Sequence, residues 1–168
     1  DGNSGKAVVV EKSPERVGIR EAQGDWIVCA NHYLTSVLAQ DPKNLNYMRH
    51  SSTLNRQQRM EEMVAGAAGK LDPFTAATML RDRGGDAYNT GGGMDPKAIN
   101  TLIATHSVIG DETAGILWVS AGPHQLGEYV PFSVLDFAAP VHEPLIPADP
   151  FLLDGRYERY MKNSKSGF

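Results

Sequence analysis

Short apolar segments separated by turn residues dominate the beginning of the chain. Residues 7–11, 16–20 and 26–30 are rich in β-branched and aromatic side chains, with Ser-Pro and Gly-Asp pairs between them. This pattern predicts three short strands joined by tight turns in an antiparallel meander. The third strand is predicted to end on Asn31 and His32.

The middle of the chain changes to a helical period. Residues 38–52 carry scattered polar residues and predict an irregular loop. A helix is predicted over 52–69, because apolar residues then recur at helical spacing at Met60, Met63, Val64 and Ala67. An Asp-Pro pair at 72–73 predicts a second helix that ends near residue 84.

The second half of the chain returns to strands. Residues 86–96 predict a glycine-rich loop, and the elements expected after it are strands over 100–109, 114–120 and 128–137 and a helix over 149–160. The turn at 110–113 joins the first two of these strands as a hairpin. The element order predicts an α+β fold with a mainly antiparallel sheet and helices on one face.

Composition narrows the possible classes of protein. The chain has 168 residues, of which 41% are hydrophobic and 21% charged, so it is not a wholly disordered protein. The net charge is −4, which gives no general attraction to nucleic acid or acidic lipid. No apolar run is long enough to span a membrane, so neither nucleic acid nor a membrane is an expected partner.

The usual motifs for metals and phosphates are missing from the sequence. No two of the five histidines have the spacing of a zinc-binding helix, and the Gly91–Gly93 run lacks the lysine of a phosphate-binding loop. We therefore expect no metal and no cofactor. The single cysteine, Cys29, is predicted to be a core residue, with the nucleophile of a self-contained thiol hydrolase as the alternative.

Two polar residues could take part in chemistry. An asparagine at a strand end, such as Asn31, can donate a hydrogen bond to a developing oxyanion. Arg56 lies in the first turn of a predicted helix, where a cation opposes the helix dipole. A carboxylate or a polarised carbonyl as its partner would explain that placement.

Several motifs together carry a resemblance to a known family. The segment 5–14 has the pattern G-x-x-x-x-x-E-x-S-P, and 30–32, the helix start at 55–60, Thr101-Leu102 and Gly122-Pro123 follow in order. This succession, over about residues 5–137, resembles the acyl-coenzyme A:6-aminopenicillanic acid acyltransferase family, with the bile-salt hydrolases as distant relatives.

The resemblance implies an N-terminal-nucleophile hydrolase with a four-layer αββα fold that acts on linear, non-peptide amide bonds. Its nucleophile is an N-terminal cysteine freed by self-cleavage, with its own α-amino group as the base. Asn31 matches the asparagine of the oxyanion hole, and Arg56 matches an arginine behind the nucleophile. The nucleophile's segment precedes the region that this chain resembles.

The expected organisation follows from this resemblance. Residues 1–137 would be the C-terminal half of the hydrolase domain, and 138–168 a proline-rich extension of the same domain with a short helix. The partners would be an N-terminal segment carrying the cysteine and a small amide or acyl donor, and a homo-oligomer stays open. The chain alone would be inactive. The alternative is a non-enzymatic α+β module that binds a ligand or a partner.

Overall fold

The computed structural model describes residues 4–22, 24–84, 95 and 97–165. The chain is divided into two compact units, Asp1–Leu71 (unit 1) and Asp72–Phe168 (unit 2). Both contain helices together with an antiparallel sheet, so the α+β class predicted from the sequence is confirmed. Nearly all of the glycine-rich loop predicted at 86–96 lies outside the described residues.

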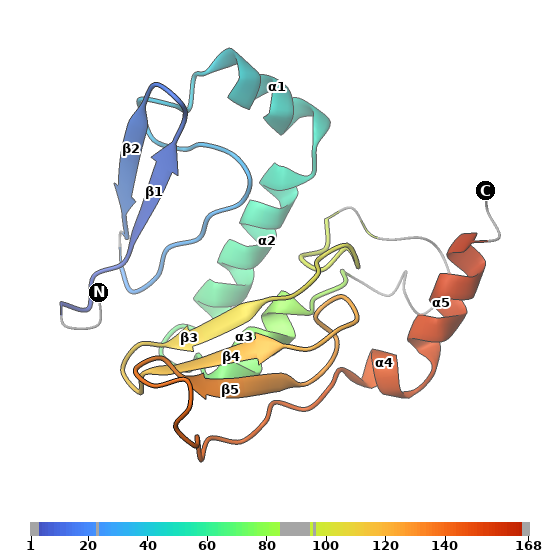
Figure 1. Cartoon of the computed structure of the whole chain (residues 1–168). Coiled ribbons are helices and arrows are strands. Elements are labelled where there is room, and N and C mark those ends of the chain that lie inside the picture. The colour runs from blue at the N-terminus through green and yellow to red at the C-terminus, as the bar shows by residue number, and fades with distance from the viewer. Residues whose placement is uncertain (1–3, 23, 85–94, 96, 166–168) are drawn as a thin grey trace. The chain divides into compact units, whose positions relative to one another are not determined.

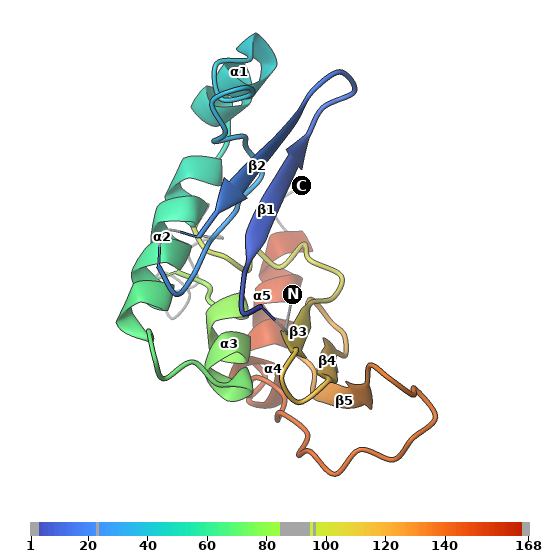
Figure 2. The ribbon, with the colours of Figure 1, turned by 90° about the vertical axis from the view of Figure 1, so that its left-hand side faces the viewer.

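Unit 1 consists of a β-hairpin, a long loop and two helices. The strands β1 (Val8–Lys12) and β2 (Val17–Glu21) pair antiparallel, and the helices α1 (Pro42–His50) and α2 (Thr53–Gly66) follow the loop. Figures 1 and 2 show the hairpin as a two-stranded ribbon and a change of direction between the two consecutive helices.

The hairpin has an unusual distribution of polarity between its two faces. On one face the apolar side chains of Val8, Val10, Val17 and Ile19 are 51–63% exposed. The other face carries Glu11, which is buried and lies opposite Gly18 in the strand register. A hairpin normally buries its apolar face and exposes its polar face, so unit 1 leaves open the face that would ordinarily be covered.

The predicted third strand is wrong. Among the described residues, 26–30 pair with no strand, and side chains rather than a ladder bind this segment. The carbonyl of Val28 accepts hydrogen bonds from Arg20 Nη2 at 3.0 Å and from Gln57 Nε2 at 3.2 Å. The predicted loop over 38–52 is also wrong in part, because it contains α1.

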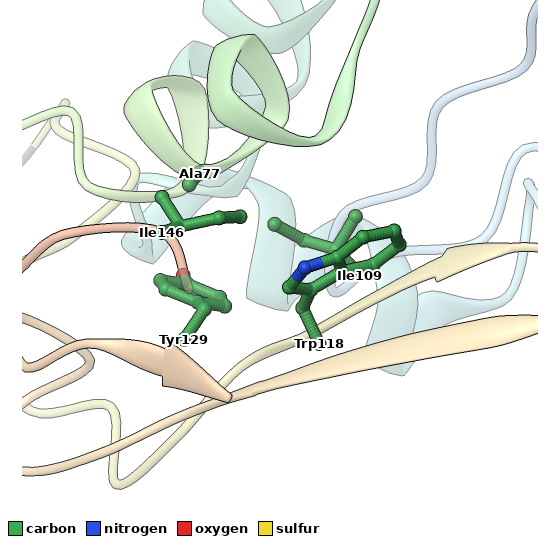
Figure 3. Packing of buried hydrophobic residues seen from close by; sticks show 5 residues of the cluster. All are labelled: Ala77, Ile109, Trp118, Tyr129 and Ile146. Carbon is green, nitrogen blue, oxygen red and sulfur yellow. The ribbon is translucent and has the colours of Figure 1, made fainter. Parts of the chain in front are cut away.

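Unit 2 is built on a three-stranded antiparallel sheet in the order β3–β4–β5, formed by Val108–Asp111, Ile116–Ser120 and Tyr129–Ser133. Helix α3 (Pro73–Leu80) packs against it. Figure 3 shows Ala77 of α3 above Ile109, Trp118 and Tyr129, with Ile146 beside them. Burial of these side chains provides the hydrophobic stabilisation of the unit.

The C-terminal segment forms a second cluster in unit 2. Instead of one helix over 149–160 there are two, α4 (Pro150–Leu153) and α5 (Arg156–Lys165). Phe151 packs with Leu102 and Leu126, and Ile146 forms an antiparallel bridge with Tyr129. The proline-rich residues after 137 therefore contribute side chains to both clusters of unit 2.

The strand predicted over 100–109 is mostly wrong. Strand β3 begins at Val108, and Leu102 has a φ of 56°, which a strand cannot accommodate. Asn100 instead organises this loop: its Oδ1 accepts the Leu102 N–H at 3.0 Å, and its Nδ2 donates to the His124 carbonyl at 3.1 Å. This bond brings the Thr101-Leu102 and Gly122-Pro123 motifs into one part of unit 2.

Candidate functional site

The loop over residues 31–35, which we call the anchored loop, is held by buried side chains of three elements in unit 1. Thr53 of α2 binds the backbone at residue 31, Asn44 of α1 at residue 33, and Glu11 of β1 at residues 34 and 35. Each of the three is polar and buried, and each bonds to the loop backbone. The loop therefore has a fixed position without belonging to a strand.

Thr53 binds the beginning of the anchored loop. Its Oγ1 accepts the Asn31 backbone N–H at 3.0 Å and lies 2.9 Å from His32 Nδ1. Thr53 is the first residue of α2, so its side-chain hydroxyl lies at the end of the helix. The start of α2 thereby determines where Asn31 lies.

Asn44 binds the middle of the loop. Its Oδ1 accepts the Tyr33 N–H at 2.9 Å, and its Nδ2 donates to the Tyr33 carbonyl at 3.1 Å and to the Ala39 carbonyl at 3.0 Å. The pairing with Tyr33 reproduces the two bonds of a strand ladder with a side-chain amide. Asn44 takes the position on α1 that an apolar residue would normally occupy.

Glu11 binds the end of the loop. Its carboxylate accepts the N–H groups of Leu34 and Thr35, the Thr35 hydroxyl and Arg20 Nε, all at 2.8–3.0 Å. Burial by itself raises the pKa of this carboxyl group, but the hydrogen bonds from Thr35, Leu34 and Arg20 outweigh it and lower the pKa. Glu11 is thus an ionised, fully paired internal group.

The close approach of the loop to the hairpin requires a glycine. A Cβ atom at Gly18 would lie 2.3 Å from Thr35 Oγ1, which is closer than any two such atoms can come. Gly18 lies beside Glu11 across the two strands, so its missing side chain makes room for the bonds of that carboxylate.

Asn31 itself is exposed at the beginning of the anchored loop. Its backbone is bound by Thr53, while its side-chain amide has no hydrogen bond to the described part of the chain. The arrangement is a positioned backbone that carries an amide donor available to another group. The sequence predicted that Asn31 lies at the end of a strand, whereas in the structure it lies in the anchored loop.

Arg56 lies one turn from the start of α2 and is half-buried. Its Nε donates to Ser52 Oγ at the long distance of 3.4 Å. Its positive charge is among the influences that lower the pKa of the His32 imidazole, the largest of which is burial. Arg56 and the anchored loop therefore belong to the same part of unit 1.

Cys29 does not have the predicted core position. Its side chain is exposed, whereas the neighbouring Val28 is buried, because the segment is bound through the Val28 carbonyl. No hydrogen bond joins the thiol to a base in the part of the chain that the structure describes. This gives no support to Cys29 as an activated nucleophile, which needs such a base.

A cleft of about 1060 Å³ lies beside β2. Its wall includes Val17, Ile19, Trp26, Leu34 and Glu61. Neither Asn31 nor Arg56 is among the residues that line it. Within the described ranges, no group of three or more His, Cys, Asp and Glu side chains could hold a metal ion, and no helix is long and apolar enough to cross a membrane.

Comparison with known families gives the decisive result. Residues 1–123 match the model of the acyl-coenzyme A:6-aminopenicillanic acid acyl-transferase family, which is almost three quarters of the chain. The chain belongs to this family. The matched residues include the whole of unit 1, and with it the anchored loop and Arg56. Searches among curated proteins and among solved structures gave no significant match.

Membership of the acyltransferase family confirms the resemblance and indicates acyltransferase or hydrolase chemistry. Glu11 stands out in the sequence only as part of the family motif, and Asn44 and Thr53 were not predicted as residues of the site. Glu11 could have been identified from its place in a strand of otherwise apolar residues, where a charge needs a buried partner. Nothing in the local sequence distinguishes Asn44 or Thr53 from ordinary helix residues.

Proposed function

We propose that this chain is the C-terminal part of an N-terminal-nucleophile enzyme that cleaves linear amide bonds or transfers their acyl group. Membership of the acyltransferase family supports the reaction class. The observation that carries the proposal is the anchored loop, in which three buried side chains position the backbone beside an exposed, available Asn31 amide. An amide donor carried on a positioned backbone suits an oxyanion hole.

The proposed reaction uses a cysteine that a preceding segment supplies. Its α-amino group takes the thiol proton, the sulfur attacks the carbonyl carbon, and the Asn31 amide donates a hydrogen bond to the resulting oxyanion. The C–N bond then breaks and the leaving amine takes the proton. Water or an acceptor amine attacks the thioester and releases the cysteine.

Arg56 is proposed to act behind the nucleophile. A guanidinium pairs with a carboxylate in a fixed, forked geometry and lowers the pKa of a nearby acid or thiol. The long bond to Ser52 uses only one of its five donors. An acidic residue of the preceding segment would be a suitable partner, so Arg56→Lys should keep the charge but lose part of the rate.

The exposed face of the hairpin supports the proposal that a further layer belongs to the fold. Val8, Val10, Val17 and Ile19 form an apolar face on a two-stranded sheet, and two-stranded sheets have little stability of their own. A second sheet packed on this face would make the four-layer αββα sandwich proposed for the whole enzyme.

The decisive experiment uses the complete gene product and a series of acyl p-nitroanilides with different chains. We expect Asn31→Ala to lower kcat by about 100- to 1000-fold with little change in KM, because the lost bond acts on the transition state. Asn55→Ala is the matched control, since Asn55 is also an exposed asparagine but lies in the first turn of α2 and not in the anchored loop. Equal turnover by Asn31→Ala and the wild type would favour a non-enzymatic binding module.

A further inference from the structure

Thr53 has a more specific role than an ordinary residue at a helix start. It is 0% exposed, and its hydroxyl oxygen lies between the Asn31 backbone N–H and His32 Nδ1. Among the described residues, the bond from the Asn31 N–H to Thr53 Oγ1 is the only hydrogen bond of the Asn31 backbone. Among the described residues, the position of the Asn31 backbone therefore depends on one buried hydroxyl.

The direction of each hydrogen bond follows from counting donors. The Asn31 N–H can only donate, so Thr53 Oγ1 accepts it. The hydrogen of the Thr53 hydroxyl then needs an acceptor, and within the described ranges His32 Nδ1 is the one available. With the hydroxyl donating to it, Nδ1 carries no hydrogen, which makes the His32 ring neutral with its hydrogen on Nε2.

Burial of the His32 ring favours its neutral form. His32 is 6% exposed, and its Nε2 atom is buried without a hydrogen-bond partner among the described residues. Burial is the main cause of the lowered pKa of His32, and it favours the neutral ring. A neutral ring can accept from Thr53 at Nδ1, which would complete a hydrogen-bonded chain that begins at the Asn31 backbone.

We propose that Thr53 is the positioning residue of the oxyanion hole: its hydroxyl accepts the Asn31 N–H, donates to His32 Nδ1 and so fixes the Asn31 amide for the reaction. This inference rests on the proposed function of Asn31. It assigns to Thr53 no contact with the substrate, because the residue is fully buried.

The first test compares two substitutions of Thr53 in the complete gene product. Thr53→Val keeps the shape but removes the hydroxyl, and it should lower kcat about 10- to 100-fold with KM nearly unchanged. Thr53→Ser restores the hydroxyl and should recover most of that loss. Because both residues act through one bond, Asn31→Ala/Thr53→Val should be no slower than Asn31→Ala.

Ser120→Ala is the matched control for a loss of stability. Ser120 is also buried, and its hydroxyl also accepts a backbone N–H, that of Ser107 at 2.7 Å. It lies in unit 2, so its removal should weaken folding and leave kcat unchanged. An equal loss of kcat in Ser120→Ala and Thr53→Val would mean that Thr53 is merely structural and would overturn the proposal.

The second test needs neither a variant nor activity. The ¹⁵N shifts of the His32 ring in histidine-labelled wild-type protein report which nitrogen carries the hydrogen, and we expect it on Nε2. A hydrogen on Nδ1 would overturn the assignment.

The kinetic test separates the two proposals. If Asn31→Ala slows turnover but Thr53→Val does not, the positioning role is wrong while the proposed function stands. An unchanged Asn31→Ala rate refutes the proposed function itself.

Discussion

Glu11 illustrates how one internal charge organises a loop. Both of its oxygens accept hydrogen bonds from Leu34, and they are also bonded to Thr35 and Arg20. A buried carboxylate is costly unless all of its acceptor sites are used. Here they are used by the anchored loop and Arg20, so these hydrogen bonds offset the cost of burying the charge and at the same time hold residues 34 and 35 in place.

Replacement of this carboxylate should strongly destabilise unit 1. In Glu11→Gln the new NH₂ group faces N–H donors, and Arg20 loses its ion pair at 2.8 Å. We expect the free energy of unfolding, measured in urea, to fall by about 3 kcal/mol. Glu21→Gln changes an exposed carboxylate of the same hairpin and should have almost no effect. Similar losses in both variants would contradict the role of Glu11.

The buried His32 ring predicts a pH dependence of stability. Burial lowers its pKa below the ordinary 6.5; the charges of Glu11 and Glu61 oppose this shift, and those of Arg20 and Arg56 add to it. The unfolded chain therefore binds a proton that the folded chain does not. The free energy of unfolding should be at its full value above about pH 6.5 and decrease as the pH falls from there toward the folded pKa.

This decrease can be assigned to His32 by urea unfolding at several values between about pH 7.5 and 5. His32→Gln should reduce the slope, whereas His142→Gln, at an exposed position, should keep it. The lowered pKa of Glu11 also makes the protein less stable as the pH falls. This loss of stability begins only near the ordinary pKa of 4.5, so it lies in a separate, more acidic pH range. A wild-type stability that is constant between pH 7 and 5 would refute the assignment to His32.

At the scale of elements, helix starts could be predicted from a single pair of residues. An Asp-Pro pair begins α1, α3 and α4, and in each case the aspartate accepts a backbone N–H of the first turn while proline occupies the first helical position. The pair at 41–42 carried the same signal, but the polar residues after it suggested a loop. The reason is that α1 buries Asn44 and therefore lacks an apolar stripe.

The absence of a strand at residues 26–30 and the loop that carries Asn31 could not be predicted. Residues 26–30 have strand-like composition, but their bonds are made by Arg20 and Gln57, which are close to them only after folding. The anchored loop likewise depends on Asn44 and Thr53, which are 11 or more residues away in the sequence. Local pattern does not show such side-chain bonds. It did show Asn31 at a predicted strand end and Arg56 at a predicted helix start, and the resemblance to the family supplied their expected roles.

The cap of α3 offers a direct test at this scale. Asp72 Oδ1 accepts the Thr75 N–H at 2.7 Å, so Asp72→Ala leaves a donor of the first turn without its partner. We expect the free energy of unfolding of unit 2, which contains α3, to fall by about 1 kcal/mol. Asp72→Asn should preserve most of the stability, because asparagine caps helices equally well. A loss in Asp72→Asn as large as in Asp72→Ala would show that the charge, and not the cap, matters.

At the scale of the whole molecule, the two units differ in how they cover their sheets. In unit 2, α3 and the segment around Ile146 cover the core side chains of the three-stranded sheet. In unit 1, the loop covers the polar face of the hairpin, and the apolar face stays exposed. Exposed apolar surface of this kind usually marks a place where another part of a protein packs.

The proposed enzyme therefore predicts that this face changes its exposure on assembly. The chain expressed alone should bind a hydrophobic dye such as ANS, and co-expression with the preceding segment of the gene product should suppress the dye fluorescence. Val10→Thr/Ile19→Thr should weaken dye binding by the chain alone and also reduce recovery of the complex in a pull-down, because the same two side chains, 60% and 63% exposed, serve both. Leu153→Ser, at a 70% exposed position beyond the residues that match the family, should leave recovery unchanged. If the chain keeps its full dye binding within an active complex, the hairpin face is not covered by the preceding segment, and the sandwich proposed for this enzyme must be closed elsewhere.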